Sequence, residues 1–286
     1  MRRDRRKVEL CKHTGGGMAG ERKTALITGA SGGIGEALAY RFAKNGYDLI
    51  LVARSADKLA SVAKAADMFE VTSTVIDLDL QDRGAGAALE ATVADKGLVV
   101  DVLVNNAGFG ATGGVLEGDL DETLGMVDLN CRVLTELSWR FGRGIKARAG
   151  EGRGPTGVLN VASTAAFQPG PYMAVYYASK AYVLSLSEAM NQEFKGSGAH
   201  VTALCPGPVK TGFQARADFD ATMGIANLPM QTAAQVAKAG YDGFAAKKAV
   251  VIPGLMNAVM ARSTAFAPRG VLLSMVETLQ KKKQRG

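Results

Sequence analysis

The chain has 286 residues and is 47% hydrophobic, enough for a large core, and its three widely spaced cysteines argue against a disulfide framework or a zinc site and for a reducing, cytoplasmic setting. Its net charge of +7 is concentrated at the ends: residues 1–17 hold six basic and two acidic side chains and residues 281–286 hold four basic ones, which leaves about −1 for the rest. A nucleic-acid-binding body needs a basic face, so this class is excluded, and no apolar run is long enough to span a bilayer.

The sequence divides into three expected regions. Residues 1–21 are expected to be a disordered basic tail, because short charge runs at chain ends are usually solvated. They are not expected to be a secretory signal, since no apolar stretch follows the first arginines. Met18 lies just before the first predicted strand and is a candidate natural start. Residues 22–254 are expected to form one domain, and residues 255–286 an amphipathic C-terminal segment.

Apolar runs and helical spacing alternate along the central region. Strands are predicted over Thr24–Thr28, Asp48–Ala53, Val71–Leu78, Val99–Val104, Val158–Ala162, Val201–Leu204 and Ala249–Ile252. Helices are predicted between them, notably over Ile34–Lys44, Asp57–Ala66, Leu120–Arg140, Val175–Phe194 and Thr232–Ala246. Residues 148–157 indicate a surface loop, and residues 207–231 a mobile loop or lid. The alternation predicts an α/β fold: a single doubly wound parallel-sheet domain of the Rossmann type, with helices on both faces and ligands bound at the carboxyl ends of the strands.

A glycine-rich corner, Thr28–Gly35, joins the first strand to the first helix. Small residues there let the backbone approach a pyrophosphate, whose charge is met by the helix N-terminus. Gly29, Gly33 and Gly35 give a variant spacing of the dinucleotide-binding fingerprint. The alternative is a plain glycine turn, but the flanking strand and helix favour dinucleotide binding.

The end of the second strand bears on the choice of nicotinamide cofactor. An acidic residue at this point would hold the ribose hydroxyls of NAD, but the chain has Ala53, Arg54 and Ser55. A guanidinium can pair with the additional phosphate of NADP through two charge-assisted hydrogen bonds. Arg54 therefore favours NADP(H) over NAD(H), the alternative being a solvated surface arginine.

A tyrosine, a lysine and a serine form the candidate reaction centre. Tyr176 and Lys180 are four positions apart in a predicted helix and so project from one face. The phenol pKa, about 10 in the free side chain, must fall by roughly 3 units for the group to act as a base near pH 7, and a nearby ammonium and a cationic nicotinamide can supply that shift. Ser163 follows the fifth strand and can donate a hydrogen bond to a substrate oxygen, although it can equally cap a turn.

Three further asparagines, in two places along the chain, are informative. Asn105, Asn106, Ala107 and Gly108 follow the fourth strand, where they can form a turn or hold adenosine and the neighbouring strand. Asn130 lies inside a predicted helix although asparagine is a poor helix former, which indicates a kink or a bound water.

In this order the motifs resemble those of the short-chain dehydrogenase/reductase family, over about residues 22–254, and the branch of general ketone or acyl reductases. The resemblance implies that Tyr176 is the acid/base, that Lys180 binds the nicotinamide ribose, that Ser163 orients the carbonyl and that Asn130 holds a water in a proton relay. It also implies adenine contacts from Asp79 and Leu80, and a nicotinamide-lining segment at residues 206–211. The complete set of expected cofactor-binding residues is Gly29, Ser31, Gly33, Ile34, Gly35, Arg54, Ser55, Asp79, Leu80, Asn106, Ala107, Gly108, Tyr176, Lys180, Pro206, Gly207, Val209 and Thr211.

The predicted function is NADP(H)-dependent interconversion of a carbonyl and a secondary alcohol in an apolar small-molecule substrate, without a metal. An epimerase or dehydratase using the same tyrosine is one alternative, and a dinucleotide-binding sensor without turnover is another, although a sensor needs only the glycines. The apolar residues between 255 and 280 predict two short helices that cover the substrate pocket, contact a second subunit or lie on a membrane. The resemblance favours the first two, in a homodimer or homotetramer.

Overall fold

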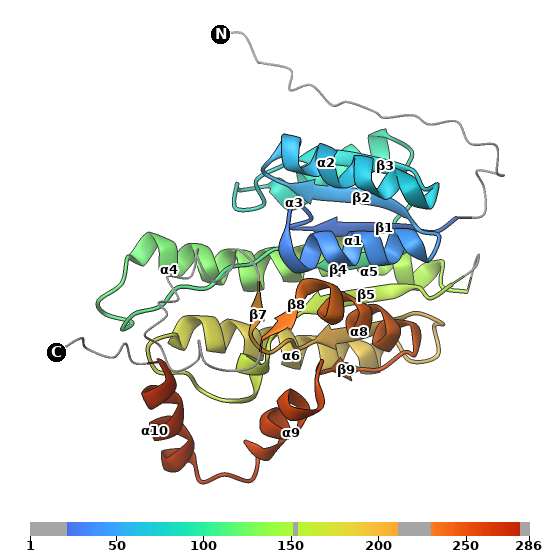
Figure 1. Ribbon diagram of the computed structural model, residues 1–286. Helices are drawn as coiled ribbons and strands as arrows, with labels where there is room; N and C mark the ends of the chain where they lie inside the picture. Colours follow the sequence, from blue (N-terminus) through green and yellow to red (C-terminus); the bar gives the residue numbers. More distant parts are fainter. Residues whose placement is uncertain (1–21, 151–153, 211–229, 281–286) are drawn as a thin grey trace, which may run out of the picture.

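A seven-stranded sheet forms the centre of the protein, whose computed structural model describes residues 22–150, 154–210 and 230–280. The strands lie in the order β3-β2-β1-β4-β5-β6-β9, and every neighbouring pair is parallel (Figure 1). They span Thr24–Thr28 (β1), Asp48–Ala53 (β2), Ser73–Asp77 (β3), Val102–Asn105 (β4), Gly157–Val161 (β5), His200–Leu204 (β6) and Val250–Val251 (β9). The strand order reverses between β1 and β4, which opens a crevice at their carboxyl ends. The predicted doubly wound α/β fold is confirmed.

Helices cover both faces of this sheet. They span Gly33–Lys44 (α1), Ala56–Ala66 (α2), Ala85–Asp95 (α3), Leu120–Val127 (α4), Leu134–Ala147 (α5), Ala174–Glu193 (α6), Ala233–Ala245 (α8), Leu255–Ser263 (α9) and Arg269–Gln280 (α10). Alternate residues of each strand face opposite sides, so Ile27 and Leu51 pack under α1, α2 and α8, whereas Leu26 and Ile50 pack under α3, α5 and the end of α6. Each of these buried side chains contributes about 1.5–3 kcal/mol of hydrophobic free energy.

The structure differs from the sequence-based expectation at two places near the crevice. The helix predicted over Leu120–Arg140 is interrupted by a π-helical turn over Asp128–Val133, which contains Asn130. Residues 207–231 were expected to form a loop or lid, but both described ends of this segment are strands: Val209–Lys210 (β7) pairs in parallel with Gln231–Thr232 (β8). Residues 211–229 lie outside the described part of the chain. Backbone pairing of two-residue strands leaves no hydrophobic period in the sequence, so this small sheet could not be read from it.

The last two helices lie at the end of the molecule opposite β3 (Figure 1). α10 packs against α6 through Leu272 and Val276, which belong to one buried cluster with Met173 and Tyr177. The Gln280 amide donates a hydrogen bond of 2.7 Å to the Tyr177 hydroxyl. Within the described residues, no helix is long and apolar enough to cross a membrane.

Candidate active site

The corner between β1 and α1 requires glycine, because side chains there would strain the backbone or collide with it. Gly29 and Gly33 have φ values of +65° and +60°, which L-residues rarely adopt. A Cβ atom on Gly35 would lie 2.3 Å from the Gly29 carbonyl oxygen, so the first turn of α1 can approach the corner only with glycine there. The result is an open cradle at the N-terminus of α1, where backbone N–H groups can meet a pyrophosphate.

The segment after β4 is fastened to this corner. The Thr28 hydroxyl accepts hydrogen bonds of 3.0 Å from the backbone N–H groups of Asn106 and Ala107. The Asn106 amide in turn donates to the backbone oxygens of Thr28 at 2.9 Å and Gly29 at 3.2 Å. The Asn106 side chain and backbone thus fasten the segment after β4 to the end of β1. Asn105 instead belongs to a buried polar network, in which it donates to Ser138 and Asn160.

The ends of β2 and β3 form a mixed-charge rim. The guanidinium of Arg54 lies 3.6 Å from the carboxylate of Asp79, and the Arg54 side chain is 54% exposed. Ser55 is the N-cap residue of α2, yet its hydroxyl makes no capping hydrogen bond. Lys58, in the first turn of α2, lines the same cavity and was missed in the sequence. A signal for Lys58 in the sequence is its position four residues after Arg54, in the first turn of the helix that follows β2.

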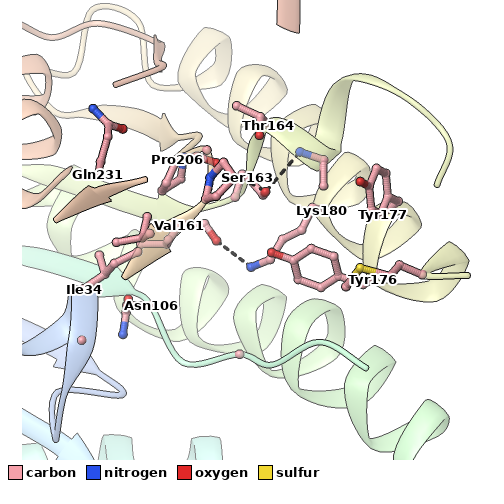
Figure 2. Close-up of a pocket in the computed structure, with 18 of the residues that line it drawn as sticks. Ile34, Asn106, Val161, Ser163, Thr164, Tyr176, Tyr177, Lys180, Pro206 and Gln231 are labelled. Atoms are coloured by element: carbon pink, nitrogen blue, oxygen red, sulfur yellow. Dashed lines mark hydrogen bonds between the residues drawn. The ribbon is translucent and has the colours of Figure 1, made fainter. Parts of the chain in front are cut away.

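The candidate reaction centre lies at the ends of β5 and β6 (Figure 2). The Lys180 ammonium is buried and donates a 2.9 Å hydrogen bond to the backbone oxygen of Val161, at the end of β5. Its nitrogen lies 5.8 Å from the ring centre of Tyr176, so the two side chains do share one face of α6. The Ser163 hydroxyl accepts a 3.1 Å hydrogen bond from the Ala165 N–H. Ser163 thus also caps the short helical turn that it precedes.

Burial controls the ionisation of both groups. It raises the pKa of Tyr176 to about 12, against the opposing effect of the hydrogen bond with Ser163. Burial also lowers the pKa of Lys180 to about 8. The expected fall in the phenol pKa therefore does not occur in the protein alone, because desolvation of the phenolate outweighs the favourable contacts.

The Asn130 side chain forms hydrogen bonds with the segment after β4 and with α6. Its amide nitrogen donates to the Phe109 oxygen at 2.9 Å and the Ser179 hydroxyl at 3.0 Å, and its oxygen accepts from the Phe109 N–H at 3.1 Å. The π-helical turn places this buried side chain against the segment that follows β4. Asn130 thereby ties that segment to α6, one position before Lys180.

One cavity of about 1260 Å³ joins these parts. It is lined by every expected site residue in the described part of the chain except Gly35, which shapes the corner from behind, and Asn130. Thr211 lies outside the described residues. At the reaction-centre end the wall comes from the C-terminal helices and is largely apolar, with Met256, Met260, Leu272, Met275, Val276 and Leu279. Gln231 and Asn257 add polar groups that the sequence did not reveal, because their neighbours in space are far away in the chain.

The chain is similar to known proteins in both sequence and structure. The sequence profile of the short chain dehydrogenase family matches residues 23–221. The chain is 31% identical to the 3-dehydrosphinganine reductase TSC10B of Arabidopsis thaliana, over 86% of this chain and 74% of that protein. Its structure is similar to that of a short-chain dehydrogenase from Sphingobium yanoikuyae in complex with NADPH, with a TM-score of 0.75, 30% identity and coverage of 92% and 100% of the two chains. It is also similar to a bulky-bulky ketone specific alcohol dehydrogenase from Comamonas testosteroni, with a TM-score of 0.71, 29% identity and coverage of 93% and 97%.

Proposed function

Because the chain belongs to the short-chain dehydrogenase family, we propose that it interconverts a carbonyl and a secondary alcohol with NADP(H) as the hydride carrier. The single observation that carries this proposal is the shared cavity. One end of it holds the cations Arg54 and Lys58, and the other end holds Ser163, Tyr176 and Lys180. A dinucleotide bound across the strand ends would extend from the first group to the second.

The residues present fit such a cofactor. Gly32, the N-cap residue of α1, has no heavy atom within 4 Å of the place where a Cβ atom would stand, so its backbone faces open space that a pyrophosphate can enter. The Ser55 hydroxyl, which makes no capping hydrogen bond, and the cations beside it offer donors for the 2′-phosphate of NADP(H). Asp79 also contacts Arg54, but it lies one strand further along the sheet edge and leaves the guanidinium half exposed. This donor set supports NADP(H) over NAD(H).

In the proposed reaction the cofactor supplies or accepts the hydride when bound. Tyr176 donates its phenol proton to the carbonyl oxygen as the alcohol forms, and Ser163 donates a hydrogen bond to that oxygen while negative charge develops on it. The hydrogen bond to the Val161 carbonyl holds the Lys180 ammonium beside the Tyr176 ring. Since the phenol pKa is about 12 in the protein alone, Tyr176 is protonated at neutral pH, which is the state that carbonyl reduction needs.

The substrate that suits the cavity is bulky and apolar. The walls contributed by α9 and α10 carry methionine, leucine and valine side chains, and methionine adapts to irregular shapes. The cavity of about 1260 Å³ exceeds the range of roughly 300–1000 Å³ usual for one small-molecule site, so it has room for a cofactor and a large substrate together. The similarity to the alcohol dehydrogenase specific for bulky-bulky ketones supports the same substrate class.

We also infer that the protein forms a homodimer or homotetramer. Leu120, Leu124 and Val127 follow one face of α4 and are each more than 40% exposed. Tyr182 of α6 and Trp139 of α5 are 42% and 60% exposed. Such apolar faces are typical of subunit contacts. Light scattering on the protein and on Leu124→Glu tests this inference, because a monomeric unmodified protein would contradict it.

A cytoplasmic location is the corresponding proposal for the cell. Cys131 and Cys205 are both free thiols in the described part of the chain. Free thiols are typical of reducing compartments.

A spectrophotometric assay of NADPH consumption tests the proposed function. The panel contains small methyl ketones and ketones with large groups on both sides of the carbonyl. We expect turnover of the bulky ketones, dependent on Tyr176. NADPH binding without turnover of any carbonyl would favour a sensor, whereas conversion of an alcohol substrate with no net change in NADPH would favour an epimerase or dehydratase.

A further inference from the structure

If the proposed function holds, the nicotinamide half of the cofactor has a definite place in the cavity, and the role inferred for Asn257 rests on that function. The donors proposed for the 2′-phosphate lie directly after β2 and in the first turn of α2, and the pyrophosphate cradle follows β1. The ring end must therefore lie on the other side of the crevice, beside Lys180 and the segment Pro206–Val209 that follows β6.

Asn257, in the first turn of α9, lies against this segment. A Cβ atom placed on Gly207 would be 2.6 Å from the Asn257 amide nitrogen and 2.7 Å from its oxygen. Glycine at position 207 is thus what allows the asparagine to touch the backbone there. Asn257 also lines the cavity together with Gly207 and Gln231.

The hydrogen bonds of Asn257 fix which end of its amide faces which way. Its nitrogen donates to the Pro253 backbone oxygen at 2.9 Å and to the Gln231 side-chain oxygen at 3.4 Å. Both N–H groups are then used, and a flipped amide would set its oxygen against the Pro253 carbonyl. The Asn257 oxygen accepts no hydrogen bond from any residue in the described ranges, so it is an oriented acceptor at the cavity wall.

We propose that the Asn257 side-chain oxygen accepts a hydrogen bond from the carboxamide N–H of the nicotinamide and so fixes the rotation of the ring beside Tyr176. The carboxamide is the only N–H donor on the nicotinamide ring, and an acceptor held by two hydrogen bonds loses little freedom on binding it. Asn257 is in this view a positioning residue, contributed by the C-terminal segment.

Three ligands separate this role from simple support of the Gly207 segment. NADP⁺ carries the carboxamide, its 3-acetylpyridine analogue has a methyl ketone in place of the amide and no N–H, and 2′-phospho-ADP-ribose lacks the ring altogether. Calorimetric titrations compare the unmodified protein with Asn257→Leu, which removes the acceptor at similar volume. The control is Gln231→Met, which loosens the same asparagine but keeps its oxygen.

For the unmodified protein we expect NADP⁺ to bind about fivefold or more tightly than the acetylpyridine analogue, as is usual for one hydrogen bond. Asn257→Leu should abolish that difference and leave the affinity for 2′-phospho-ADP-ribose unchanged, whereas Gln231→Met should retain the preference. Equal loss of all three affinities in Asn257→Leu, or an unchanged preference for NADP⁺, would overturn the inference. If the unmodified protein bound none of the three ligands, the proposed function itself would fail.

Discussion

Removal of the Arg54 guanidinium is the most direct test of cofactor choice. The ion pair between Arg54 and Asp79 is 3.6 Å long and the arginine is half exposed, so breaking it costs only about 0–1 kcal/mol. A charge-assisted hydrogen bond to the 2′-phosphate is worth about 1.5–3 kcal/mol. The net gain from Arg54 is then about 0.5–3 kcal/mol, and Arg54→Ala should raise the NADPH dissociation constant roughly 2- to 160-fold.

The same substitution should leave NADH nearly unaffected, because NADH has no phosphate for the guanidinium to bind. Fluorescence titration with both cofactors measures the two dissociation constants. Arg143→Ala is the matched control, since Arg143 stacks on Trp139 and does not line the cavity. Asp79→Asn gives a test of opposite sign: it frees Arg54 and removes a negative charge near the phosphate, so it should favour NADPH further over NADH.

Two results would refute this reasoning. One is an unmodified protein that binds NADH as tightly as NADPH. The other is an Arg54→Ala protein that loses affinity for both cofactors equally, which would assign the arginine a role in the shape of the rim rather than in phosphate binding.

Tyr176→Phe should abolish turnover and leave NADPH affinity nearly intact, because only the proton of the phenol is used in the reaction; rates near those of the unmodified protein would exclude the acid/base role. Since burial lowers the pKa of Lys180 to about 8, its ammonium is present below that pH and lost above it. The kcat/KM for NADPH should therefore fall as the pH rises past about 8, and a flat profile across this range would contradict a role for the cation in cofactor binding. Asn130→Ala removes the hydrogen bonds that its side chain makes with both Phe109 backbone groups, so urea denaturation should show a loss of about 2–4 kcal/mol of unfolding free energy, and a loss below about 1 kcal/mol would contradict a stabilising role for these bonds. A protein shortened to begin at Met18 should keep its melting temperature and activity, since residues 1–17 have no apolar period; a large fall in either would show that this segment matters.

The parts of the site that could be predicted from sequence are those in which chemistry and local geometry coincide. The glycine corner must follow a strand and open a helix, and Tyr176 and Lys180 share a helix face at any location in a fold. Arg54 could be placed because the second strand ends directly before it. In each case a few neighbouring residues define both the element and the side-chain direction.

The parts that could not be predicted depend on contacts between distant segments. Tyr177 and Gln280 are 103 positions apart, and Asn257 reaches Gly207 only because α9 folds back over the end of β6. The pKa of Tyr176 also depends on distant segments, because it is raised by the packing of α10 and other elements around the phenol. This packing cannot be predicted from two residues four positions apart.

The position of α9 and α10 in the chain has an evolutionary consequence. The family profile ends at residue 221, before these helices begin, whereas the glycine corner and the Tyr176–Lys180 pair lie within it. Mutations at the apolar positions of α9 and α10 can thus reshape this wall without changing the glycine corner or the Tyr176–Lys180 pair. We expect a chimera that carries the corresponding helices of a relative to show an altered substrate selectivity.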